Sequence, residues 1–146
     1  MRRRIIGYGN PFRRDDAVGL EVAKKLQPLH LPETEVISIE GDGLTLLEIL
    51  RDCRGAVLID ALHSGDAPGT LRCIQLLDEN IPDEILASTH AVGIRQAIEL
   101  GKKLRCLPSR VTLYGIAGKD FSLGQGLTPP VQSAAEQLVR ILSELP

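Results

Sequence analysis

The 146-residue sequence has few aromatic residues, few cysteines and no long hydrophobic run, and each shortage excludes a class of protein. Aromatic residues make up 3% of the chain and tryptophan is absent, so a stacking platform for bases or sugars is not available. Seventeen Lys and Arg against nineteen Asp and Glu give a net charge of −2, which argues against a nucleic-acid partner. No apolar run approaches the roughly 18–20 residues that cross a bilayer, so we expect no membrane partner.

Cysteine usage and the N-terminal segment predict a cytoplasmic protein. The cysteines are widely spaced, without a C-x-x-C pair, which suits free thiols in a reducing compartment; they are Cys53, Cys73 and Cys106. After three arginines only Ile5 and Ile6 precede Gly7, so we expect no secretory signal. No repeat, low-complexity tract or linker is visible, and residues 1–146 are predicted to form a single domain.

Short apolar segments alternate with segments of helical periodicity along the chain. The expected strands cover 4–8, 35–39, 56–59, 69–75 and 110–116, and the expected helices cover 18–26, 44–50, a segment from 88–89 to Gly101, and a segment that begins at 129 or 130. This alternation predicts an α/β domain with three α/β/α layers around a mainly parallel sheet. In such sheets functional groups gather beyond the carboxyl ends of the strands.

Three side chains at these strand ends predict a metal site. Asp16 follows the first strand, Asp60 directly follows the very apolar third strand, and His90 precedes a later helix. Two carboxylates and an imidazole suit a divalent ion such as Zn²⁺, Ni²⁺ or Mn²⁺, with coordination positions left open. A carboxylate at the partly buried position of Asp60 needs a cation or hydrogen-bond donors, because burial removes its hydration.

Structural roles compete with this interpretation. Asp15 is expected to cap the helix that begins near Ala17, rather than to take part in chemistry, and Asp60 could stabilise a turn. A histidine in a first helical turn is often only packed or hydrogen-bonded. His63 is the second candidate for the nitrogen ligand, and His30 between two prolines is expected in a loop.

The glycine-rich turns at the same edge are expected to approach a peptide or a neighbouring loop closely. Gly7-x-Gly9 resembles the start of a dinucleotide fingerprint, but Phe12 replaces its third glycine. The chain also has no Walker sequence, no Gly-x-Ser-x-Gly elbow and no His-Glu-x-x-His motif. The residues predicted to bind substrate are Gly9, Asn10, Gly41, Asp42 and Gly43.

Several motifs along the chain resemble those of one family, the hydrogenase maturation endopeptidases. They are GYGNPFRRDDAVG at 7–19, IDA at 59–61, PGT at 68–70, STHAVG at 88–93 and GLTP at 126–129. The resemblance covers nearly the whole chain in the same order and spacing. Position by position, it implies that the metal-contacting residues are Asp16, Asp60 and His90; many members have Glu at the first of these positions. It also implies a phosphorylase/hydrolase-like fold, whose sheet is five-stranded and mixed with the strand at 69–75 antiparallel.

The family resemblance implies an activity and a partner. Members remove a C-terminal extension from the large-subunit precursor of nickel–iron hydrogenases after nickel insertion. We therefore expect a protease that recognises nickel contributed by its substrate, and zinc or cadmium can substitute for it. Asp16 and Asp60 are the expected catalytic residues, through either an aspartyl-protease-type general base or a metal-assisted route. A non-catalytic maturation chaperone that binds the metal or the precursor is the alternative, and a nucleotide-binding domain is a further one.

Overall fold

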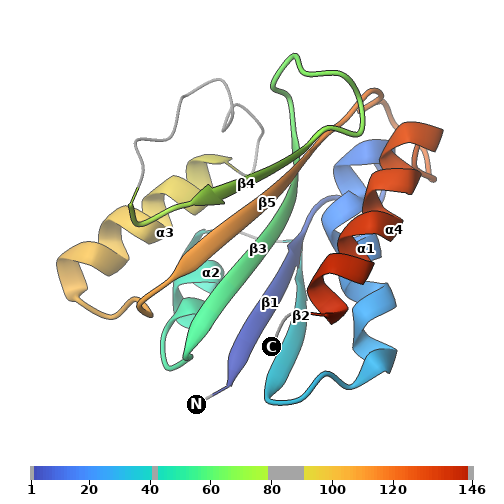
Figure 1. Cartoon of the computed structure of the whole chain (residues 1–146). Helices are drawn as coiled ribbons and strands as arrows, with labels where there is room; N and C mark the ends of the chain where they lie inside the picture. The colour runs from blue at the N-terminus through green and yellow to red at the C-terminus, as the bar shows by residue number, and fades with distance from the viewer. Residues whose placement is uncertain (1, 41–42, 79–90, 145–146) are drawn as a thin grey trace.

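The computed structural model describes residues 2–40, 43–78 and 91–144, and in them strands and helices alternate (Figure 1). The strands are β1 (Arg3–Tyr8), β2 (Thr34–Ile39), β3 (Gly55–Leu62), β4 (Leu71–Gln75) and β5 (Val111–Ala117). The α-helices are α1 (Val18–Leu26), α2 (Gly43–Leu50), α3 (Ala91–Leu104) and α4 (Pro129–Ser143), and two short 3₁₀ helices are η1 (Arg14–Ala17) and η2 (Gln27–Leu29).

The strands form one five-stranded sheet in the order β2-β1-β3-β5-β4. β1 pairs in parallel with β2 and β3, and β3 pairs in parallel with β5. β4 alone among these strands is antiparallel to its neighbour, with Cys73 opposite Tyr114 of β5. The expected mixed, mainly parallel sheet with an antiparallel fourth strand is confirmed.

Helices cover both faces of the sheet, as Figure 1 shows. α1 and α4 pack together on one face, where the core includes Ile5, Val57 and Leu138. α2 and α3 pack together on the other face, where the core includes Ile6, Leu58 and Leu113. Successive residues of β1 and β3 thus point into opposite cores, because side chains alternate along a strand. The predicted three-layer α/β/α arrangement is confirmed.

Two elements extend beyond their predicted ends. β3 continues to Leu62, because Asp60 and the two residues after it stay paired with β5. α3 passes Gly101 and ends at Leu104, so the prediction that Gly101 stops this helix is wrong. Gly101 is buried, and a Cβ atom there would overlap the Leu107 side chain, so the glycine leaves room for Leu107 to pack against α3.

The parallel pairing brings the carboxyl ends of β1 and β3 side by side. Gly7 and Ile59 form the last residue pair between these two strands, so Asp60 is the first residue of β3 beyond its pairing with β1. No helix within the described ranges is both long and apolar enough to cross a membrane.

Candidate active site

The structure buries both predicted catalytic carboxylates at the carboxyl ends of adjacent strands. Asp16 lies in η1, in the segment that follows β1, and is 3% exposed. Asp60 lies in β3 and is 2% exposed. η1 contacts β3, so the two acidic residues belong to neighbouring elements of one edge of the sheet.

The loop after β1 positions Asp16. The Asn10 backbone N–H donates to Asp16 Oδ2 (3.1 Å), and the Asn10 side-chain oxygen accepts from the Phe12 N–H (2.9 Å). Gly9 is buried against η1, where a Cβ atom would overlap the Asp16 carbonyl oxygen. The segment that closely approaches Gly9 is therefore η1 of the chain itself. Contacts of Gly9 and Asn10 with substrate stay a prediction.

Asp60 accepts a hydrogen bond from the next residue of its own strand. The Ala61 N–H donates to Asp60 Oδ1 over 2.8 Å. Next to it, Gly19 lies so close to the backbone of Tyr8 and Ile59 that a Cβ atom would be only 2.7 Å from the Tyr8 nitrogen. Because two buried carboxylates need cations or donors around them, this edge of the sheet is suited to binding a positively charged centre.

The third predicted metal ligand, His90, lies outside the described residues, as do Gly41 and Asp42. Gly43 is the first residue of α2. Within the described parts of the chain, no group of three His, Cys, Asp or Glu side chains is placed to hold a metal ion. The meeting of Asp16 and Asp60 with His90 therefore stays a prediction.

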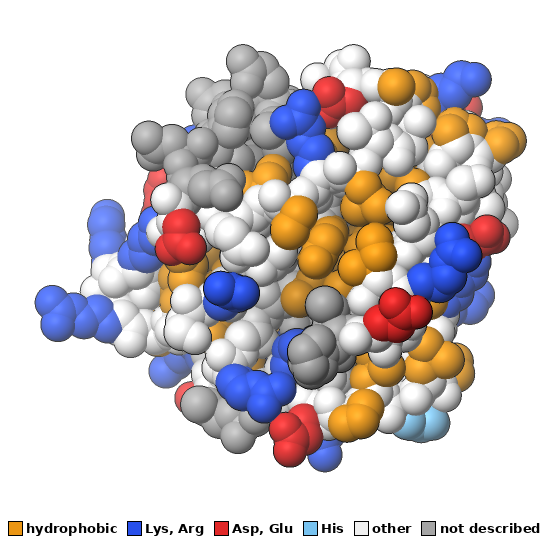
Figure 2. All heavy atoms as spheres, viewed as in Figure 1, with side chains coloured by type: hydrophobic (Ala, Val, Ile, Leu, Met, Phe, Trp, Pro, Cys, Tyr) orange, Lys and Arg blue, Asp and Glu red, His pale blue; other side chains and the backbone are white. Residues whose placement is uncertain are grey.

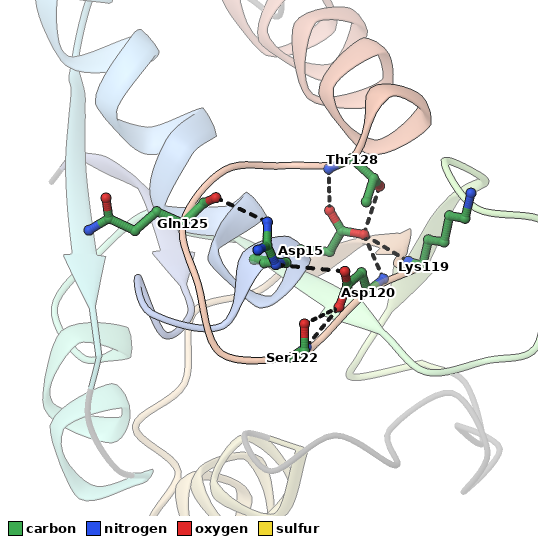
Figure 3. Close-up of polar contacts among 7 residues, drawn as sticks. Asp15, Lys119, Asp120, Ser122, Gln125 and Thr128 are labelled. Carbon is green, nitrogen blue, oxygen red and sulfur yellow. Dashed lines mark hydrogen bonds and ion pairs between the residues drawn. The ribbon is translucent and has the colours of Figure 1, made fainter.

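Asp15 does not cap a helix, and that prediction is wrong. Neither η1 nor α1 has a side-chain N-cap hydrogen bond. Instead the fully buried Asp15 carboxylate accepts four hydrogen bonds (Figure 3). The donors are the N–H groups of Lys119 (2.8 Å), Asp120 (3.0 Å) and Thr128 (2.8 Å) and the Thr128 hydroxyl (2.8 Å). Asp15 thus ties the loop between β5 and α4 to η1, which carries Asp16.

Sequence reasoning missed this contact because its partners are more than 100 positions away. The loop is further fixed by Arg14, whose backbone N–H donates to the Gly124 carbonyl (3.2 Å) and whose side chain lies 3.7 Å from Asp120 Oδ2. The hydroxyl and N–H of Ser122 both donate to Asp120 Oδ1 and hold the pKa of that carboxyl below its ordinary value. The adjacent aspartates at 15 and 16 are the one feature of the sequence that points to this contact, and they do not indicate which residues bind Asp15.

The two other histidines lie in the described chain. His63 is exposed, just after β3, and its ring stacks on Phe121 with centroids 3.6 Å apart. His30 is exposed with a left-handed backbone (φ 46°) at the end of η2, as expected of a loop residue. Stacking occupies one face of the His63 ring.

Comparisons with known proteins agree on one family. A family model described as hydrogenase maturation protease (HycI) matches residues 20–144. The Escherichia coli hydrogenase 2 maturation protease is 27% identical over 153 residues, covering 99% of this chain and 92% of the relative. The hydrogenase expression/formation protein HupD of Rhodobacter capsulatus is 28% identical over 133 residues, and the match covers 87% of this chain but only 62% of that longer protein.

Solved structures show the same fold. The hydrogenase maturating endopeptidase HybD from E. coli superposes with a TM-score of 0.80 at 22% identity, covering 97% of this chain and 90% of that one. The [NiFe] hydrogenase maturation protease HybD from Thermococcus kodakarensis gives a TM-score of 0.70 at 23% identity, and the match covers 99% of this chain and 98% of that one.

Proposed function

Because the chain belongs to the hydrogenase maturation protease family, a family of peptidases, we propose that it removes the C-terminal extension of a nickel–iron hydrogenase large-subunit precursor after nickel insertion. The observation that carries the proposal is the pair of buried carboxylates, Asp16 and Asp60, on adjoining elements at the carboxyl edge of the sheet. The three unpaired cysteines support a place in the reducing cytoplasm.

The nickel ion of the precursor acts in this proposal as part of the substrate. Carboxylate and imidazole ligands suit Ni²⁺, and also Zn²⁺ or Cd²⁺, so Asp16, Asp60 and His90 would complete the coordination of an ion that has open positions. The extension would then be bound for cleavage only when the precursor carries its metal. Gly9 and Asn10, together with Gly41, Asp42 and Gly43, would contact the extension peptide.

Two routes to peptide hydrolysis are compatible with these residues. In one, the ion polarises the scissile carbonyl or lowers the pKa of a bound water, and the two aspartates hold the ion. In the other, Asp16 or Asp60 accepts a proton from the attacking water as a general base. The Ala61 N–H on Asp60 and the Asn10 N–H on Asp16 orient one oxygen of each carboxylate for either role.

Processing of a nickel-loaded precursor by single variants tests the assignment. We expect Asp16→Asn, Asp60→Asn and His90→Ala each to lower the rate at least about 100-fold, the usual contribution of a positioned acid–base group. Asp52→Asn is the matched control: Asp52 is exposed in the turn before β3, and its left-handed backbone (φ 56°) suits asparagine. Wild-type rates for the three variants would show that the site is misassigned.

Two additional measurements separate the alternatives. Mass spectrometry of the precursor distinguishes a peptidase, which shortens the chain, from a maturation chaperone, which leaves its mass unchanged. Cleavage that continues after both proteins are stripped of metal by a chelator would contradict the metal-assisted route and favour the general base.

A further inference from the structure

A cavity of about 250 Å³ lies at the end of the sheet opposite to the candidate active site. Its walls come from the amino-terminal parts of β1, β3 and β5, from Arg110 just before β5, and from the last residue of β4. Gly55 lies in this cavity and Asp60 is five residues further along β3, so the two sites are about 16 Å apart at roughly 3.3 Å per strand residue.

The cavity is on the face of the sheet that α1 and α4 cover in part. Val57 points to the α1 and α4 core, and its register partner Thr112 points the same way. Figure 2 shows this side of the molecule, with hydrophobic side chains in the centre of the view and Lys and Arg side chains around them. The cavity thus lies where the helices leave this face of the sheet uncovered, and it is not a space inside a core.

The charged residues that line the cavity are both arginines, Arg3 and Arg110. Within the described chain neither forms an ion pair, whereas Arg54 pairs with Glu33 (3.1 Å). The Arg3 guanidinium donates to Thr34 Oγ1 (3.2 Å), whereas its Nε is fully buried and has no hydrogen-bond partner. Burial, followed by the charge of Arg54, lowers the pKa of Arg3. A partly desolvated cation without a counter-ion is unfavourable, so this cavity favours an anion.

The remaining walls fit the stem of a small organic anion. Gly55 leaves the floor open, since a Cβ atom there would meet nothing nearer than the Arg110 carbonyl oxygen at 3.7 Å. Val57 and the Tyr114 ring offer apolar surface, and the Thr112 hydroxyl donates to Gln75 Oε1 (3.0 Å), which leaves the Gln75 amide N–H groups for a ligand.

We propose that this cavity binds the side-chain carboxylate of an acidic peptide segment of a partner protein, with Arg3 and Arg110 as its cationic walls. Guanidinium groups match a planar carboxylate through paired hydrogen bonds. The volume is below the roughly 300–1,000 Å³ of sites for whole cofactors, so one acidic side chain fits better than a nucleotide. A phosphate site would favour a cluster of backbone N–H groups, whereas here the strand N–H groups are used in the sheet, as in the bond from Ala56 N–H to the Arg110 carbonyl. The proposal does not depend on peptidase activity.

Tyrosine fluorescence and NMR of the intact protein test the binding. The chain has no tryptophan and two tyrosines; Tyr8 is fully buried in the core, so Tyr114 reports on the cavity. The probe is an acetylated, amidated Gly-Glu-Glu-Gly peptide, with Gly-Gln-Gln-Gly as the neutral control and inorganic phosphate as a third arm. We expect a saturable signal with the glutamate peptide alone, and amide shifts at residues 55–57 and 110–114 but not at 15–19.

Three variants in the cavity and one control variant outside it locate the binding. Arg3→Gln and Arg110→Gln each remove a charged donor and should weaken binding about tenfold or more. Lys103→Gln, exposed on α3, removes the same charge elsewhere and should change binding less than about twofold. Gly55→Val keeps both arginines but fills the floor, and should also weaken binding about tenfold. Equal binding of the glutamine peptide or of phosphate, or unchanged binding in both arginine variants, would overturn the proposal.

Discussion

Asp15 and Asp16 are neighbours in the sequence and both are buried, but their carboxylates have different surroundings. All four donors around Asp15 belong to the loop between β5 and α4, so this side chain joins two distant parts of the chain. Asp16 instead accepts from Asn10 in the loop after β1 and lies beside β3. Asp15 therefore positions the segment that presents Asp16.

At this scale we predict that Asp15→Asn destabilises the fold by about 3 kcal/mol. Both oxygens of Asp15 face donors, so the amide of asparagine would place N–H against N–H, and a buried unsatisfied donor costs about 1–3 kcal/mol in addition to the lost charged hydrogen bonds. Urea unfolding measures the change. Asp120→Asn is the control: the new amide group would keep an oxygen for Ser122, and a much smaller loss of stability is expected. An equally small loss for Asp15→Asn would contradict the role given to Asp15.

At the scale of elements, contact between α1 and the ends of two strands sets the position of η1. Gly7 and Gly19 face each other across the interface between β1 and α1, and a Cβ atom on either would overlap backbone of the other element. The helix consequently lies directly on the strands. η1, which immediately precedes α1, is brought to the carboxyl edge of β3 by this contact.

We predict that Gly19→Ala destabilises the protein by about 1–3 kcal/mol, because the added methyl group forces α1 away from Tyr8 and Ile59. The same variant should slow precursor processing, since η1 carries Asp16. Gly55→Ala adds the same methyl group where the nearest atom is 3.7 Å away, and it should leave stability within about 0.5 kcal/mol. Thermal unfolding of both variants measures the difference; equal melting temperatures would argue against the close contact.

At the scale of the whole molecule, a single sheet separates two cores. Cys53 belongs to the core under α2 and α3, is 4% exposed, and donates its thiol to the Leu50 carbonyl (3.3 Å). Burial raises the pKa of this thiol, so the reactive thiolate is disfavoured in the folded state. Cys73 on β4 is exposed and Cys106 is half-buried.

We therefore predict that Cys53 reacts with a thiol reagent only when the fold opens. In the double variant Cys73→Ser/Cys106→Ser, labelling should be slow without denaturant and should accelerate with urea in parallel with global unfolding. The matched protein that retains Cys73 alone should label within the mixing time of a manual assay. Rapid labelling of Cys53 under native conditions would show that its core opens locally.

Local patterns in the sequence were sufficient to predict the class of fold and the residues around which a site could form. Hydrophobic periodicity and strand-end polar residues predicted the alternating elements, and both Asp16 and Asp60 are buried at the carboxyl edge of the sheet, as that pattern indicates. These features are local, since they depend on spacing along one segment and on the general rule that parallel strands end together.

The partners of these residues, by contrast, follow from how distant segments pack in the folded chain. The hydrogen bonds of Asp15 with Lys119 and Thr128, the pairing of β3 with β5 beyond Asp60 and the cavity between Arg3 and Arg110 all join segments that are far apart in the chain. A sequence pattern can indicate that a carboxylate or a glycine has a structural or functional role. The hydrogen-bond donor or side chain that it contacts belongs to another segment and comes next to it only in the folded protein. Contact with the loop between β5 and α4, rather than spacing along the chain, therefore distinguishes the positioning residue Asp15 from the proposed catalytic residue Asp16.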